Sequence, residues 1–278
     1  MSAPERRRGL ALNLHAIYAR AYVRIVGVNR ELSWVLYDTL LPMVSSVAYV
    51  FIYRALGAPP RFEAFAVLGM AMATYWFHVL WGMAAQFYWE KDMGNLELYL
   101  QAPMSRMSIL AGMALGSMFS ATVRFATILA AGVLLFGIRF DVPSWGALAG
   151  VFALTLVALD GLGMTAASLF FVYGRGVHQV MGLLQEPVFL AAGFFFPVRP
   201  FIGRWALLVG SIVPLTFGLD AIRQCTLALA PGEALLSVGA EAAALAVMSA
   251  AFLATSHFAL AHMETLAKRD GTLTLKWQ

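Results

Sequence analysis

The sequence predicts an all-α, polytopic membrane protein. Hydrophobic residues make up 61% of its 278 residues, charged residues only 12%, and the mean hydropathy is +0.76, whereas apolar residues are roughly half of a soluble domain. Several stretches reach the length of about 20 residues that a helix needs to cross about 30 Å of hydrocarbon. Runs such as AVLGMAMATYWFHVLWGMAA lack the alternation of apolar and polar residues found in membrane β-strands. The spans are therefore expected to be helices.

Six such spans are predicted, which places both chain ends on one side of the membrane. They cover residues 33–54, 63–87, 108–136, 145–172, 179–197 and 233–262. Basic residues concentrate in the N-terminal residues 1–32, in the loop 88–107 and in the tail 263–278. Because basic residues collect on the cytoplasmic side, we expect these three segments in the cytoplasm. The six-span domain over 33–262 is then expected in the inner membrane.

Residues 10–30 predict an amphipathic helix before the first span. Apolar residues recur there at steps of three and four, namely Leu10, Leu14, Ile17, Ala21, Ile25 and Val28. Arg20 and Arg24 fall on the other face, so we expect a helix that lies along the inner membrane surface with its arginines at the lipid headgroups. The pattern leaves open whether this helix is an anchor alone or also rests on a cytoplasmic partner.

The loop 88–107, with the sequence WEKDMGNLELYLQAPMSR over 89–106, is charged and connects the second and third predicted spans. Gly94 and Pro103 break helix continuity, while the intervening charges and leucines predict a short helix with mixed faces. Read by composition alone, this is a connecting loop that its charges keep soluble.

Two motifs give the chain a resemblance to a known family. The first is Glu90-Lys91-Asp92-Met93-Gly94-Asn95-Leu96-Glu97, followed by Leu100, Ala102-Pro103 and Ser105-Arg106; the second is Gly193-Phe194-Phe195-Phe196-Pro197, followed by Trp205, Pro214-Leu215, Asp220 and Arg223. Together with the six spans they resemble the exporter permeases of the ATP-binding-cassette type 2 family. Asn95 stands where that family usually has Thr, and Val213 where it often has Asn.

The resemblance implies a role for the first motif. In such permeases this inner loop forms a coupling helix that docks in a cleft of a separate ATPase subunit. The residues to which it assigns this role are Glu90, Asp92, Gly94, Glu97, Leu98, Pro103 and Arg106.

A helical hairpin is predicted in the connection 198–232, before the last span. Its apolar part Trp205 to Val213 is too short to span a membrane, and Pro214 separates it from a second helical piece, Leu215 to Leu229. We expect a re-entrant hairpin on the outer side, shielded by protein or water. As the resemblance implies, Phe196, Pro197, Pro214, Asp220 and Arg223 would shape the outer exit; otherwise the hairpin is a cap without a transport role.

Charged residues inside spans are costly and therefore need partners. Arg124 in the third span and Asp160 in the fourth lie at similar depth by residue counting, so we expect them to neutralise each other. Asp38 lies nearer the inner end of the first span and is expected to reach toward the headgroups. Glu186 precedes Pro187 in the fifth span, where a kink is expected. We place Glu186 in a translocation pathway or at a dimer seam.

No nucleotide site is predicted in this chain. A P-loop needs Gly-Lys followed by Ser or Thr, and the lysines follow Glu90, Ala267 and Leu275. No cofactor is expected here: ATP and magnesium would be bound by the partner ATPase, and a second copy or a sister permease would complete the pathway. The net charge of +4 is explained by membrane topology and lipid headgroups rather than by nucleic acid.

The expected activity is export of a hydrophobic or amphiphilic, drug-like or lipid-like substrate, because the spans are rich in Phe, Met and Trp and poor in charge. Export of a lipid-linked glycan or polysaccharide is the alternative within this class. A non-transporting scaffold and an intramembrane enzyme are alternatives of other classes. The enzyme would have to draw on His78, Asp160, Glu186, His257 or His262, with at least two of them within hydrogen-bond reach.

Overall fold

The computed structural model describes residues 3–95, 98–99, 104–173, 176–203, 205–227, 229 and 232–269, and within them the chain forms helices and turns but no strand. The helices are α1 (Ala3–Arg30), α2 (Leu32–Ala55), α3 (Arg61–Phe77), the π-helix η1 (His78–Ala84), α4 (Ala85–Asp92), α6 (Arg106–Phe136), α7 (Trp145–Tyr173), α8 (Val177–Ala191), α9 (Val198–Ile202), α10 (Trp205–Ile212), α11 (Pro214–Thr226) and α12 (Val238–Arg269).

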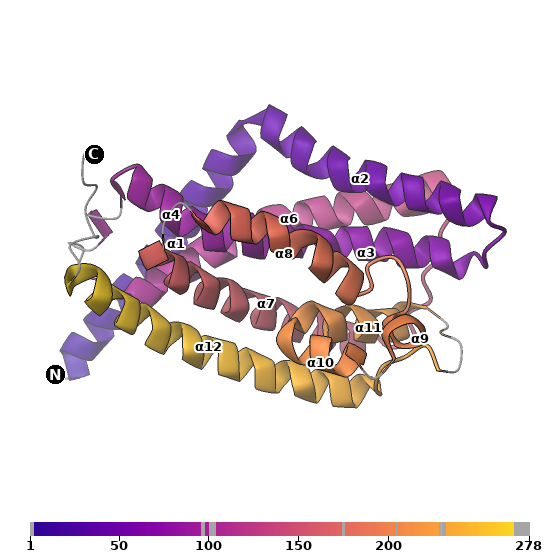
Figure 1. Cartoon of the computed structure of the whole chain (residues 1–278). Coiled ribbons are helices and arrows are strands. Elements are labelled where there is room, and N and C mark those ends of the chain that lie inside the picture. Colours follow the sequence, from indigo (N-terminus) through magenta and orange to yellow (C-terminus); the bar gives the residue numbers. More distant parts are fainter. Residues whose placement is uncertain are drawn as a thin grey trace.

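The long helices form an elongated bundle. Among the described residues, 5 helices are long and apolar enough to cross a membrane: Leu32–Ala55, Arg61–Ala84, Arg106–Phe136, Trp145–Leu169 and Val238–Met263. The first turn of α1 and the last turn of α12 lie at the same end of the bundle (Figure 1). We call this the terminal end, and the opposite end, which carries α9 to α11, the cap end. The prediction of an all-α, multi-pass membrane protein is confirmed.

The central helix of the bundle is the continuous segment α3–η1. In the span Arg61–Ala84, 89% of an 18-residue apolar segment is buried inside the protein, compared with 17% of the corresponding segment of Leu32–Ala55. Aromatic rings hold its middle, where Tyr75 packs against Phe125 of α6 and Phe152 of α7 at centroid distances of 5.5 and 5.6 Å. The apolar surface of α2 is therefore left for lipid or another chain, while α3 carries the contacts inside the protein.

The predicted fifth span, 179–197, is not one continuous helix, and this prediction was wrong. The helix found there, α8, has 15 residues, about 22 Å at 1.5 Å per residue, which is less than the hydrocarbon thickness. It ends before Gly193, whose φ of 66° is left-handed and favours glycine. A Cβ at Gly193 would overlap the side chain of Val198. The backbone therefore turns at this point and leads into α9.

At the cap end, α10 and α11 form the predicted helical hairpin. They are bent by 111° relative to each other, at Val213, which has an extended backbone. Pro214 begins α11, where its missing N–H costs no helical hydrogen bond. The second helix ends at Thr226, three residues earlier than expected.

Candidate functional site

The charged loop is anchored by a buried carboxylate, Glu90, on α4. Its side chain forms an ion pair with Arg20 of α1, and only 4% of the residue is exposed. Gln86 and Asn95 donate amide hydrogen bonds to the two carboxylate oxygens at 2.8 and 2.9 Å, and the Tyr99 hydroxyl donates a third at 3.0 Å. Four side chains from α1, α4 and the loop therefore converge on one carboxylate.

This network keeps Glu90 ionised. Burial by itself raises the pKa of the Glu90 carboxyl, but the Arg20 charge and the hydrogen bonds from Gln86 and Asn95 outweigh it, so the pKa is lowered overall. Burial raises the pKa of Tyr99 to about 12, so the phenol stays a hydrogen-bond donor. Glu90 is directed into the protein, so it joins the loop to α1 and is not itself a docking charge on the surface.

Arg20 and Arg24 of α1 face the protein, and their predicted position at the headgroups was wrong. Gly112 and Gly116 of α6 receive them: a Cβ at either glycine would lie 2.7 Å from the Cβ of Arg20 or of Arg24. Arg24 donates to Gln86 at 2.8 Å, and burial, together with the neighbouring Arg20, lowers its pKa to about 10. The partners Glu90 and Gln86, which the helix pattern does not show, determine this orientation.

An apolar row on α1 points away from the bundle. Leu10, Leu14, Tyr18 and Tyr22, spaced by four residues, are each more than half exposed. Of the predicted apolar row, only Leu10 and Leu14 lie on this exposed face, which also holds tyrosines, whereas Ile17, Ala21, Ile25 and Val28 are half-buried. The predicted apolar face was therefore wrong, and the position of α1 along the inner membrane surface stays a prediction. An exposed face of leucines and tyrosines suits the boundary of a lipid layer.

The rest of the loop is described in part. Gly94 has a φ of 76°, which permits the turn after α4, and Ser105 donates its backbone N–H to Asn13 of α1 at 2.8 Å. Arg106 begins α6, and Leu98 is 65% exposed. The side chain of Asp92, and Glu97 and Pro103 altogether, lie outside the described residues.

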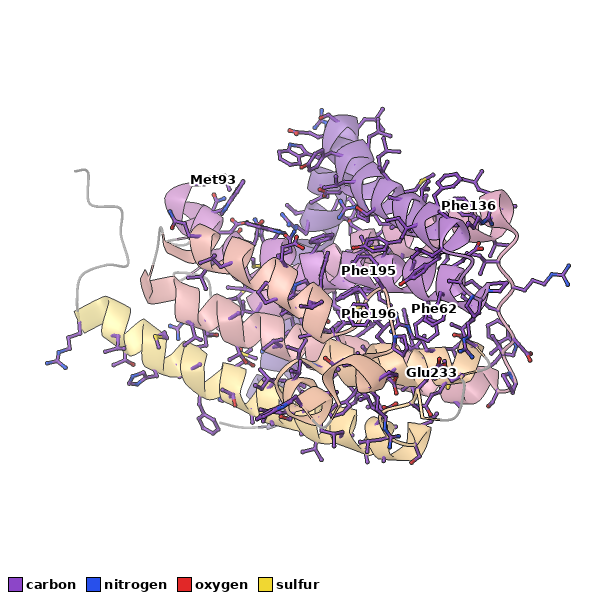
Figure 2. All side chains as sticks on the ribbon, turned by 45° about the vertical axis from the view of Figure 1, so that its right-hand side comes forward. Phe62, Met93, Phe136, Phe195, Phe196 and Glu233 are labelled. Carbon is purple, nitrogen blue, oxygen red and sulfur yellow. The ribbon has the colours of Figure 1, made fainter. Side chains whose placement is uncertain are left out.

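Exposed apolar residues lie near the charged positions of this loop. Met93 is 60% exposed and Trp89 47%, and Met93 stands at the tip of the segment that follows α4, directed away from the bundle (Figure 2). No role was predicted for Trp89 or Met93, although apolar residues within a charged, solvent-facing loop are a signal for a contact surface.

The intramembrane charges pair differently from the prediction. Arg124 on α6 lies 2.9 Å from Asp38 on α2, and Asp160 on α7 lies 2.7 Å from His78 Nε2 on η1. The Arg124–Asp160 pair was therefore wrong, and Asp38 has a partner inside the protein. Residue counting placed Asp38 nearer the inner end of its span than Arg124, yet the two side chains meet, and counting gave no information on the side of each helix from which a charge projects.

The pairing can be tested by double-mutant cycles on unfolding in detergent. We expect Arg124→Gln and Asp38→Asn to be non-additive by about 1 kcal/mol, because the second substitution removes a charge that has already lost its partner. Arg124→Gln and Asp160→Asn should instead add to within about 0.5 kcal/mol. Coupling of Arg124 to Asp160 but not to Asp38 would contradict the observed arrangement.

Glu186 on α8 differs from these pairs. It is exposed, and its side chain accepts a hydrogen bond at 3.3 Å from Gln185; no basic partner is found for it within the described part of the chain. Leu183 and Leu190 on the same helix are also exposed, at 74% and 62%. A carboxylate on a mostly apolar face is costly against lipid. Its assignment to a pathway or a dimer seam stays a prediction.

The cap end is organised around Arg223, which is 1% exposed. Its guanidinium donates to the carbonyl oxygens of Gly193 at 2.7 Å, Phe194 at 2.8 Å and Phe65 at 3.2 Å, and it lies over the Phe65 ring, 4.3 Å from the centroid. Arg223 therefore fixes the turn after α8 by binding its backbone carbonyls, and connects this turn to α3 and α11.

Neighbouring residues complete this end. Phe195 stacks on Tyr49 of α2 with ring centroids 3.6 Å apart, and Phe195 and Phe196 lie together near the bundle centre, with Phe62 farther toward the cap end (Figure 2). Pro197 is buried and precedes α9, and Pro214 is buried at the start of α11. The role of these residues in shaping an outer exit stays a prediction.

The sequence matches the family described as ABC-2 type transporter over residues 19–227. The chain belongs to this family. The match begins within α1 and ends after α11, so it includes the charged loop and the cap. As a member of the ABC-2 family the chain is a transport component. Of the residues considered for an intramembrane enzyme, His78 and Asp160 do meet, but Glu186 lies on the exposed face of α8.

This ABC-2 permease is also similar to a curated relative, "Probable multidrug resistance protein NorM" of Streptococcus pneumoniae serotype 4. The two are 27% identical over 190 residues, which is 67% of this chain and 38% of the relative. The chain thus matches well under half of that protein's length.

Proposed function

We propose that this permease is the membrane subunit of an ATP-driven exporter in the inner membrane, with both termini cytoplasmic. ATP and magnesium would be held by separate ATPase subunits that dock on the loop 88–107. Two copies, or one copy and a sister permease, would enclose the path. Family membership over residues 19–227 supports the transport role, and the exposed Met93 and Leu98 support a docking surface beside the loop's charges.

The single observation that carries the coupling proposal is the Glu90 network. Helix α4 continues the central segment α3–η1, so a displacement of the loop reaches the core directly. Through Arg20 the same loop is joined to α1, and α1 lies along α6 at Gly112 and Gly116. An ATPase that moves this loop would therefore move α1, α3 and α6 together. Nucleotide bound to the ATPase would favour one of two arrangements of the spans. This requires that the complex bind nucleotide more tightly in one arrangement than in the other.

The proposed substrate is hydrophobic or amphiphilic and drug-like or lipid-like. The similarity to a protein named for multidrug resistance supports this class, as does the apolar face around Glu186, which would line the path between two permeases. Two pairs of polar residues, Arg124 with Asp38 and His78 with Asp160, contact each other inside the subunit. In this arrangement they therefore stabilise the structure of the subunit.

The test is co-purification with candidate ATPases, followed by measurement of ATP hydrolysis and transport into inverted vesicles. Met93→Glu with Leu98→Glu, and separately Glu97→Arg, should reduce complex formation by about tenfold or more, because each places an unfavourable charge in the docking surface. Trp145 is exposed at the cap end, so Trp145→Glu is the matched control and should leave assembly with the ATPase unchanged. Normal assembly and hydrolysis in all loop variants would refute the docking proposal.

A further inference from the structure

Two carboxyl groups are buried together at the cap end. Asp220 of α11 is 3% exposed, and Glu241, in the first turn of α12, is 0% exposed. The Nε2 atom of Gln224 lies 3.0 Å from Asp220 Oδ2 and 3.0 Å from Glu241 Oε2. Since both oxygens contact one nitrogen, they are within about 6 Å of each other, a separation at which buried like charges strongly oppose joint ionisation.

The hydrogen bonds around Gln224 lack one donor. Its amide nitrogen carries two hydrogens but faces three acceptors, the two carboxyl oxygens and the carbonyl of Leu236 at 2.9 Å. The backbone N–H of Leu235 donates to Asp220 at 2.8 Å and that of Leu236 to Glu241 at 3.3 Å. A proton on one carboxyl group would supply the missing donor.

The charges around the pair compensate one carboxylate but not two. Arg223, three residues after Asp220, supplies the nearby positive charge, although its guanidinium donates its hydrogen bonds to backbone carbonyl groups. The other ionisable groups described on neighbouring elements are engaged elsewhere or lie toward the terminal end: Arg61 with Glu233, Arg199 with the Ala234 carbonyl, Asp160 with His78, and His257, His262 and Arg269 farther along α12. Cys225 is a neutral neighbour on α11.

We propose that Asp220 and Glu241 form a proton-binding site, which holds one proton between the two carboxyl groups and thereby fastens the start of α12 to α11. The proton is donated by one carboxyl group and accepted by the other, and no bond other than O–H is made or broken. When the proton leaves, two carboxylates face each other in a buried place, and their repulsion separates α11 from residues 235–241. The site is a latch that loosens as pH rises. It does not depend on the substrate or the ATPase proposed above.

The sign of the pH effect follows from linkage. The folded protein keeps a proton that a free carboxyl group loses in the unfolded chain, so above the pH at which free carboxyl groups ionise, the folded state binds more protons. The folded-to-unfolded ratio should then fall by up to about tenfold per pH unit. The thermal midpoint should decrease by about 3 °C per unit in a chain of this size.

The experiment measures this midpoint in nanodiscs from about pH 5.5 to about pH 8.5. Glu241→Gln keeps the shape and acts as a permanently protonated group, so it should flatten the pH slope relative to the wild type. Glu233→Gln, which removes an acid from the neighbouring loop that is paired with Arg61, is the matched control and should keep the wild-type slope. Equal slopes in the wild type and Glu241→Gln would overturn the proposal.

A second measurement does not depend on the stability of a variant. Infrared spectra of the wild type at neutral pH should contain the carbonyl band of a protonated carboxyl group, and this band should be lost as pH is raised. Hydrogen exchange at the amides of Leu235 and Leu236 should accelerate over the same range beyond the intrinsic pH effect measured at the Ala206 amide, which donates to Gly203 in the cap. Absence of the band at neutral pH would also overturn the proposal.

Discussion

Replacing Glu90 by glutamine is expected to abolish most substrate-dependent transport while the protein still binds the proposed ATPase subunit. Glutamine cannot neutralise Arg20, which is largely buried, and breaking a buried pair costs about 3 kcal/mol or more. The neighbours Asn95 and Tyr99 also lose a charged acceptor. The loop should then move without α1, and transport should fall by about tenfold or more. The measurement is transport per ATP hydrolysed in reconstituted vesicles.

A charge exchange separates coupling from general damage. The double variant Arg20→Glu with Glu90→Arg restores opposite charges at the same positions and should regain part of the transport lost in either single variant. Arg30→Gln, which removes a charge from the last turn of α1, is the control and should leave the ratio of transport to hydrolysis unchanged. Full transport by Glu90→Gln would show that the network plays no part in coupling.

Replacing Arg223 by leucine is expected to cause a large loss of stability. The substitution leaves the carbonyl oxygens of Gly193, Phe194 and Phe65 without the donors that satisfy them, and each unsatisfied buried group costs about 1–3 kcal/mol. The total, about 4 kcal/mol, should lower the thermal midpoint by about 8 °C or more in a chain of this size. Thermal unfolding in detergent is the measurement.

Two variants make this prediction specific. Arg223→Lys retains a charge but cannot reach three carbonyls from one planar group, so it should recover only part of the stability. Arg199→Leu removes an exposed side chain that makes one hydrogen bond, to the Ala234 carbonyl. It should change the thermal midpoint by about 2 °C or less. Similar losses in Arg199→Leu and Arg223→Leu would contradict a special role for Arg223.

Local chemistry made several features of this permease predictable. Long uninterrupted apolar runs required helices in a membrane, because no other arrangement satisfies the backbone there. Pro214 has no backbone N–H to donate, and this fixed the break between α10 and α11. The charged segment between two apolar runs indicated a loop outside the bilayer. The fifth span was overestimated because apolar composition continues through Phe194–Phe196, whereas the turn depends on Gly193 and on the carbonyl contacts of Arg223.

The sequence by itself determined the membrane class, the helical content, and the positions of the charged loop and the cap hairpin. Only the tertiary structure decided that Arg124 meets Asp38, that Arg20 turns inward to Glu90, and that Glu241 joins Asp220. The physical reason is that the helical rise of about 1.5 Å per residue converts sequence position into depth along an axis. The side of the helix that meets a given neighbour depends on how all the helices pack, which no local pattern contains.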